Sequence, residues 1–194
     1  VKMKCRYITL TLLLLLIIPS YSNSKVKSSD WLIGYTGGYF TPFGNYSGYF
    51  EPSISYGATF IYLTGYYGFF IESYLSYSRS TIADLGNSYV DQFTLTAGPG
   101  YSFQILPWFE PYVTLQAGGD YMNFSFEELK EQSGSLKPCG IATAGIMISP
   151  FEYFSFRIGG GLGLTEISDK YHTSYMLNAS AVMRMNVFSE RDRK

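Results

Sequence analysis

The sequence predicts an all-β fold, a closed eight-stranded antiparallel transmembrane β-barrel, on three observations. Apolar and polar residues alternate with period two in eight segments, and turn residues separate these segments. No apolar run after residue 24 is long enough for a membrane helix. Aromatic residues make up 19% of the chain and charged residues only 15%, whereas about a quarter of the residues in soluble domains are charged.

Residues 1–24 are expected to be a signal peptide. Basic residues precede an apolar stretch at 8–18, Pro19 ends that stretch, and small residues suited to cleavage follow. Residues 25–194 are then the barrel domain, with a short periplasmic tail. The domain keeps 11 of the 14 Lys and Arg residues and all 15 Asp and Glu residues. This acidic balance argues against a nucleic-acid partner.

The eight expected strands follow one another without a linker or second domain. They cover residues 31–40, 53–63, 68–79, 91–104, 110–121, 139–149, 153–165 and 175–188. Each is long enough to cross a membrane as a tilted strand of about 9–11 residues. Because every backbone polar group must be paired inside a bilayer, the sheet has to close, and the first strand must pair with the last.

In every segment one parity carries large apolar side chains. In chain order these include Trp31, Ile33 and Tyr35; Ile54, Tyr56 and Phe60; Phe69, Ile71 and Leu75; Phe93, Leu95 and Tyr101. The series continues with Val113, Leu115 and Tyr121; Ala142, Ile146 and Ile148; Phe156, Ile158 and Leu162; Leu177, Met183 and Val187. The opposite parity is mostly Gly, Ser and Thr. Aromatic residues near strand ends are expected to form two interfacial girdles.

Such alternation fits either a soluble barrel with the apolar face inward or a membrane barrel with the apolar face outward. The lysines favour the membrane barrel, because none after residue 24 falls in a predicted strand. They are Lys25, Lys27, Lys130, Lys137, Lys170 and Lys194. A sheet face washed by water is normally rich in charge. The polar face here suits a closed interior instead.

Three charges interrupt the polar face: Glu72, Arg157 and Arg184. The interior of an eight-stranded barrel is filled by side chains, and a buried charge is tolerated only when it is paired. We expect these three residues to form an ionic network in the lumen with a structural role. A gate across a narrow path is the functional alternative.

The connections alternate between long and short, as in outer-membrane barrels. An even number of strands leaves both termini in the periplasm, so the long connections 41–52 and 122–138 are expected outside, with a medium one at 166–174. These loops carry candidates for binding external ligands. They are Tyr46, Tyr49, Phe50, Phe124, Phe126, Glu127 and Glu128.

Motifs for a cofactor or metal are missing from the sequence. Residues 159–163 (GGGLG) do not fit a dinucleotide loop, and alternate glycines in a barrel strand leave room for bulky neighbours such as Tyr74 or Tyr112. One His and one Cys after residue 24 do not make a typical zinc site. Neither a cofactor nor a metal is expected.

The chain resembles the small eight-stranded outer-membrane barrels of the OmpW/OmpX type over nearly its whole length. Residues 38–42 (GYFTP), 97–101 (AGPGY) and 111–113 (PYV) carry the resemblance. It implies a monomer in the outer membrane of a diderm bacterium, inserted by the barrel-assembly machinery and surrounded by outer-membrane lipid. It also implies a narrow conduit for small, largely apolar molecules that leave sideways into the lipid. Loop-mediated adhesion to a host or external ligand is the alternative function.

A third, minor alternative comes from residues 172–174 (HTS), expected where the last external loop enters the final strand. They resemble the His-x-Ser pair of the outer-membrane lipid A deacylases, which implies His172 as base and Ser174 as nucleophile. The glutamate that orients the base in those enzymes has no match, because Asn186 stands at its position. The chain is therefore not expected to be an enzyme.

Overall fold

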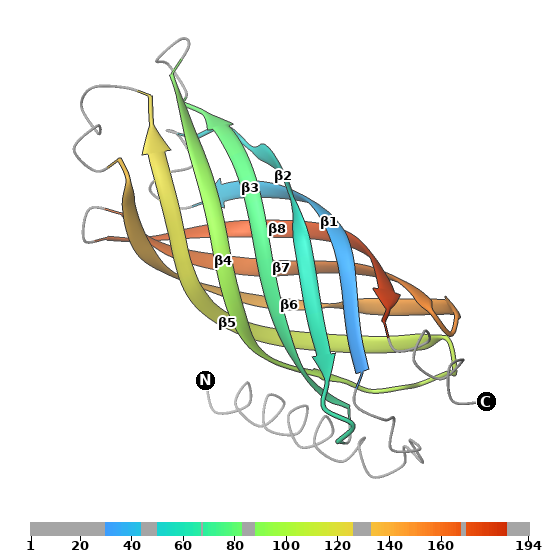
Figure 1. Cartoon of the computed structure of the whole chain (residues 1–194). Coiled ribbons are helices and arrows are strands. Elements are labelled where there is room, and N and C mark those ends of the chain that lie inside the picture. Colours follow the sequence, from blue (N-terminus) through green and yellow to red (C-terminus); the bar gives the residue numbers. More distant parts are fainter. Residues whose placement is uncertain are drawn as a thin grey trace, which may run out of the picture.

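Eight antiparallel strands wind around a common axis and close on themselves (Figure 1). The computed structural model describes residues 30–43, 50–66, 68–82, 88–125, 133–167 and 170–185. The strands are β1 (Asp30–Phe43), β2 (Ser53–Leu63), β3 (Phe69–Thr81), β4 (Tyr89–Ser102), β5 (Phe109–Phe124), β6 (Ser135–Phe151), β7 (Phe154–Ile167) and β8 (Lys170–Arg184). Each pairs with the next along the chain. β1 also pairs with β8, so the predicted closure is confirmed and the sheet has no free edge.

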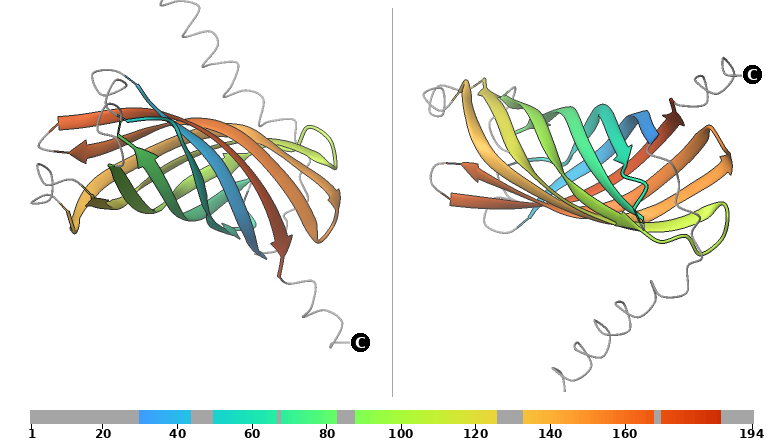
Figure 2. Two further views of the ribbon diagram at one scale, coloured as in Figure 1. Left: turned by 90° about the horizontal axis from the view of Figure 1, so that it is seen from above. Right: turned by 60° about the horizontal axis from the view of Figure 1, so that its bottom comes forward.

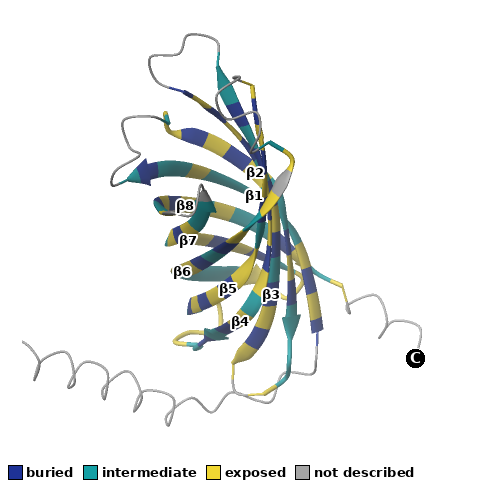
Figure 3. Cartoon of the chain, turned by 90° about the vertical axis from the view of Figure 1, so that its left-hand side faces the viewer, coloured by how far each residue is buried: buried dark blue, intermediate teal, exposed yellow. Residues whose placement is uncertain are grey.

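The side chains alternate between the two faces of the wall, as the period-two pattern predicts. Figure 3 shows this alternation as bands of buried and exposed residues along each strand. The parity assigned from the sequence is confirmed: Trp31, Leu95 and Leu115 point outward, and Glu72 and Arg157 point inward. The outer face is therefore apolar, and the inner face is mostly polar.

Aromatic side chains form two partial rings on the outer face, each across four neighbouring strands, in agreement with the predicted girdles over that part of the barrel. One ring lies near the turns that join β2 to β3 and β4 to β5, which we call the turn end. The opposite end, where β1 leads to β2 and β5 to β6, is the loop end. The turn-end ring contains Trp31, Tyr62, Phe69 and Tyr101, and the loop-end ring contains Tyr56, Tyr77, Phe93 and Tyr121. Aliphatic residues between the rings form a lipid-facing belt, so the fold is a transmembrane β-barrel.

The strands are longer than expected toward the loop end. β5 continues to Phe124 and β6 begins at Ser135, so the expected connection 122–138 is shorter than predicted. Likewise β7 runs to Ile167 and β8 begins at Lys170, so only two residues separate these strands where the connection 166–174 was expected. Hydrogen bonding continues the ladders beyond the apolar belt, where hydrophobic alternation no longer marks a strand.

This extension corrects the prediction for two of the lysines. Lys137 and Lys170 lie within β6 and β8, near the loop end, instead of in connections. The described strand β8 ends at Arg184, so the predicted strand end at Phe188 lies outside the described residues. The expected signal peptide and the tail also lie outside them.

Short turns close the other end of the barrel. The β2–β3 turn contains Gly65 and Gly68, both with positive φ angles (75° and 82°) that glycine adopts without a steric penalty. The β6–β7 turn has only two residues between its strands, after a register shift between Ile148 and Phe151. Figure 2 shows the tilted strands from two further directions. Within the described residues, no helix is long and apolar enough to cross a membrane.

Candidate functional site: the barrel lumen

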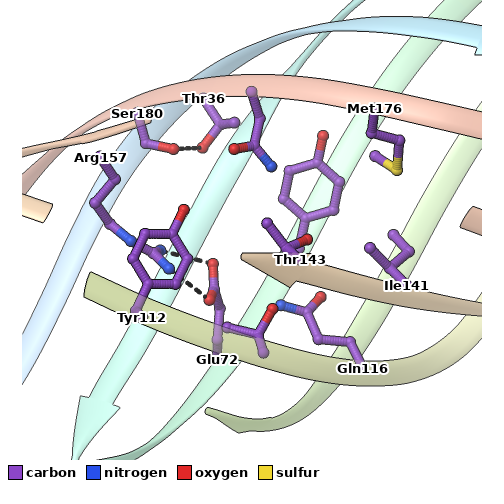
Figure 4. Close-up of a pocket in the computed structure, with 12 residues that line it drawn as sticks. Thr36, Glu72, Tyr112, Gln116, Ile141, Thr143, Arg157, Met176 and Ser180 are labelled. Carbon is purple, nitrogen blue, oxygen red and sulfur yellow. Dashed lines mark hydrogen bonds and ion pairs between the residues drawn. The ribbon is translucent and has the colours of Figure 1, made fainter. Parts of the chain in front are cut away.

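An ion pair crosses the lumen between β7 and β3, which lie on opposite sides of the barrel. Arg157 donates two hydrogen bonds to the carboxylate of Glu72, at 2.7 and 2.9 Å, and both side chains are buried. Thr59 on β2 donates a third hydrogen bond to the same carboxylate, at 2.8 Å. The ring of Tyr112 on β5 lies 4.1 Å from the Arg157 guanidinium, a cation–π distance (Figure 4). Four strands are thereby joined through one charge pair.

The third predicted member of the network, Arg184, does not join this pair. Its side chain lies at the turn end of the lumen, where its Nε is 3.2 Å from a carboxylate oxygen of Asp30 on β1. The three charges therefore belong to two separate pairs, which corrects the predicted single network. Parity places a side chain in the lumen but does not give its height along the barrel axis.

An apolar layer fills the lumen at the level of the Glu72–Arg157 pair and below it, toward the turn end. The buried side chains of this layer are Leu32, Ile61, Phe70, Tyr112 and Val182, with Leu63 and Met147 packed against them. None of these inward-facing apolar residues was expected from the sequence except Tyr112. Their presence closes the turn end of the described lumen by side-chain packing.

Glycines on β6 and β7 make room for Tyr112, as the sequence predicts. A Cβ atom added at Gly159 would lie 2.6 Å from the Tyr112 hydroxyl, and one at Gly145 would lie 2.8 Å from the ring. Real Cβ atoms do not approach other atoms so closely. The glycine-rich stretch of β7 is thus explained by packing.

A buried carboxylate that the sequence analysis did not identify lies closer to the loop end. Asp120 on β5 is 1% exposed, and its two oxygens accept hydrogen bonds from Thr94 on β4 and Thr165 on β7, at 2.5 Å each. Its position has the same parity as Thr114 and Gln116, a signal that would have placed it in the lumen. Asp30 and Glu110 were missed in the same way and are also buried.

Above Asp120, at the loop end, the lumen opens into an apolar recess of about 510 Å³, part of which is open to solvent, and we call this recess the cup. Its lining is Phe40, Pro42, Phe50, Ser80, Val90, Gln92, Met122, Phe124, Thr165, His172, Thr173 and Ser174. Val90, Met122 and Phe124 form a buried cluster against which Phe50 packs. The cup is larger and more apolar than the two recesses that lie deeper in the lumen.

This arrangement corrects two of the predicted surface-binding residues. Phe124 is 5% exposed and belongs to β5, and Phe50 packs against it, so both line the cup instead of presenting their rings on an outer loop. Phe124 has the inward parity of its strand, which was predicted to end three residues earlier. The other candidates, Tyr46, Tyr49, Phe126, Glu127 and Glu128, lie outside the described residues.

His172 and Ser174 lie within strand β8 and not in a loop, paired with Thr165 and Gly163 of β7. Both side chains line the cup. Cys139 is a buried free thiol on β6, beside the cavity that contains Asp120. Within the described residues, no group of three or more His, Cys, Asp or Glu side chains is arranged to hold a metal ion.

The features above define a class: a small transmembrane β-barrel whose lumen is filled at the turn end and recessed at the loop end. No family model and no curated protein matches the chain. Among solved structures, Neisserial surface protein A (NspA) has a similar fold, with a TM-score of 0.63 and 10% sequence identity over 80% of this chain and 97% of that one. This likeness concerns the fold.

Two further solved structures match with lower scores. Ail, the attachment invasion locus protein of Yersinia pestis, is 18% identical with a TM-score of 0.46, over 79% of this chain and 97% of that one. A de novo designed transmembrane β-barrel is 15% identical with a TM-score of 0.43, over 82% of this chain and 98% of that one. The resemblance to the OmpW/OmpX type stays a prediction from the sequence.

Proposed function

We propose that this protein is an outer-membrane barrel of a diderm bacterium whose external mouth admits small, largely apolar molecules. The cup supports this proposal. It is a recess open to solvent whose wall area is mostly apolar, with six apolar and six polar side chains in its lining, and small-molecule sites are commonly built from such apolar walls with polar groups among them. A loop-end opening would face the outside in the topology expected for such barrels.

The packing of the lumen toward the turn end favours an exit sideways into the lipid over an exit through the turn end. A molecule that moved from the cup toward the turn end would meet the buried layer of Tyr74, Ile141 and Met176, and then the Glu72–Arg157 pair. Movement through these layers would require packed and paired side chains to separate. The proposed conduit therefore releases its cargo into the lipid. The alternative of adhesion rests on loop residues outside the described part of the chain.

Binding in the cup is tested with 2-phenylethanol as the probe and methionine methyl NMR as the readout, with the protein in phosphatidylcholine nanodiscs. We expect a saturable shift of the Met122 methyl group, because Met122 lines the cup. Met147, in the turn-end layer, is expected to stay unchanged. Met183 faces the lipid and reports partitioning of the probe into the bilayer.

A matched pair of variants on β3 completes this test. Ser80→Phe fills the cup and is expected to abolish the saturable shift of Met122, whereas Ser73→Phe places the same ring on the outer face and is expected to preserve it. Equal binding in both variants would show that the probe does not occupy the cup, and this result would contradict the proposed function.

The proposed orientation predicts which end of the barrel is accessible from outside the cell. In a Cys139→Ser background, Ser133→Cys at the loop end should react on intact cells with a membrane-impermeant maleimide. Glu152→Cys, in the β6–β7 turn, should react only after the cells are lysed. Labelling of Glu152→Cys alone on intact cells would show the reverse orientation.

A further inference from the structure

Asp120 is a buried carboxyl group with hydrogen bonds at both oxygens. The Thr94 hydroxyl donates to one carboxylate oxygen and the Thr165 hydroxyl donates to the other, from two different strands. Both carboxylate oxygens are thus engaged with hydroxyl groups from neighbouring parts of the barrel wall. The side chain is almost completely removed from solvent.

No cation balances this charge within the described residues. Elsewhere in the lumen Glu72 pairs with Arg157 and Asp30 with Arg184. Asp120 forms no ion pair among the described residues, not even with Lys137, which is its register partner on β6. A buried charge is costly unless an opposite charge compensates it. Among the described residues, Asp120 is therefore a buried carboxylate without a counter-ion, on the wall of the loop-end half of the lumen.

Space for a counter-ion exists directly beside it. Asp120 lines a small recess of about 20 Å³, enough for one water-sized group such as an ammonium, whose walls carry the hydroxyl groups of Ser55, Ser76 and Ser78. This cavity and the cup share Phe40, Gln92, Thr165 and Ser174 in their linings, so the two recesses adjoin each other. A molecule in the cup can thus direct one end toward Asp120.

We propose that the cup and Asp120 form a single site for a small molecule with an apolar body and one protonated amine. The apolar body occupies the cup, and the ammonium group points inward to the Asp120 carboxylate, with serine and threonine hydroxyls as further acceptors. An ammonium is a compact cation with several donors, which suits a lone carboxylate surrounded by hydroxyls. A carboxylate ligand would be repelled by Asp120 and should bind more weakly. This proposal rests on the proposed function and specifies its ligand class.

Three probes of nearly equal size isolate the charge: 2-phenylethylammonium, 2-phenylethanol and phenylacetate. Their affinities are measured from the Met122 and Met176 methyl shifts of the membrane-inserted protein in zwitterionic phosphatidylcholine nanodiscs. Met122 lines the cup and Met176 lines the Asp120 cavity. We expect the ammonium to bind at least tenfold more tightly than the alcohol, and phenylacetate to bind more weakly than the alcohol.

Asp120→Asn keeps the size and the acceptor oxygen but removes the charge. It should reduce the affinity for the ammonium at least tenfold and change that for the alcohol less than threefold. Asp91→Asn is the matched control. It removes a carboxylate at the loop end of β4 that pairs on the outer face with Arg79, and the preference for the ammonium should remain.

Equal affinities of the wild-type protein for the ammonium and the alcohol would overturn the amine site and leave the cup intact. Retention of the preference in Asp120→Asn would also overturn it. A lack of any saturable shift with all three probes would overturn both this inference and the proposed function. The wild-type comparison decides the question even if Asp120→Asn does not fold.

Discussion

Glu72→Ala is expected to lower the free energy of unfolding by about 3–5 kcal/mol, because it leaves Arg157 buried without an acceptor. Both hydrogen bonds from the guanidinium to the carboxylate are lost, and the Thr59 hydroxyl loses its acceptor as well. The Tyr112 ring remains beside the cation but does not replace an ion pair. Denaturant titration of the barrel in lipid vesicles, followed by the loss of its heat-modifiable mobility on gels, measures the change.

The double variant Glu72→Leu/Arg157→Met is the control for this experiment. It removes both charges and replaces them with apolar side chains, so most of the lost stability should return. An unfolding free energy of Glu72→Ala equal to that of the wild type would show that the pair does not contribute to stability. Equal losses in the single and double variants would show that cavity formation, and not the unpaired charge, is responsible.

Leu115→Arg is expected to destabilise the inserted barrel by about 2–4 kcal/mol, the cost of a cation near the bilayer midplane. Leu115 lies in the middle of β5, points outward and is 65% exposed in the isolated chain, so lipid is its surrounding. A long side chain reaches toward water from this depth only at a cost. The same denaturant titration gives the size of the effect.

Leu136→Arg provides the matched comparison, since it introduces the same change on the same face at the loop end of β6. Near the interface the cost should fall to about 0–1 kcal/mol. Equal costs at the two positions would contradict the placement of the belt between the aromatic rings. A cost near zero at Leu115 would contradict the transmembrane assignment itself.

The outward direction of the large apolar side chains within the predicted strands could be predicted from the sequence. Side chains alternate along a strand with a period of two, and a membrane admits only a closed sheet, so parity alone assigns Trp31 to the lipid and Arg157 to the lumen. The ends of the strands were less predictable. Phe124 and His172 lie beyond the apolar belt, where hydrogen bonding extends a strand without a change in hydrophobicity.

The partners inside the lumen were decided by the tertiary structure. In the register of the sheet, Glu72 pairs with Ile61, Ile61 pairs with Leu32, and Leu32 pairs with Arg184. The side chain of Glu72 nevertheless binds Arg157 on the opposite wall and not Arg184. The strands are tilted against the barrel axis, so residues that are level along the ladder lie at different heights in the lumen. The same tilt brings Thr165 on β7 to Asp120, whereas Thr94 is the direct register partner of Asp120 on β4. Sequence alternation thus determined the face of each residue, and the stagger of the closed barrel determined which charges meet and which one stays unpaired.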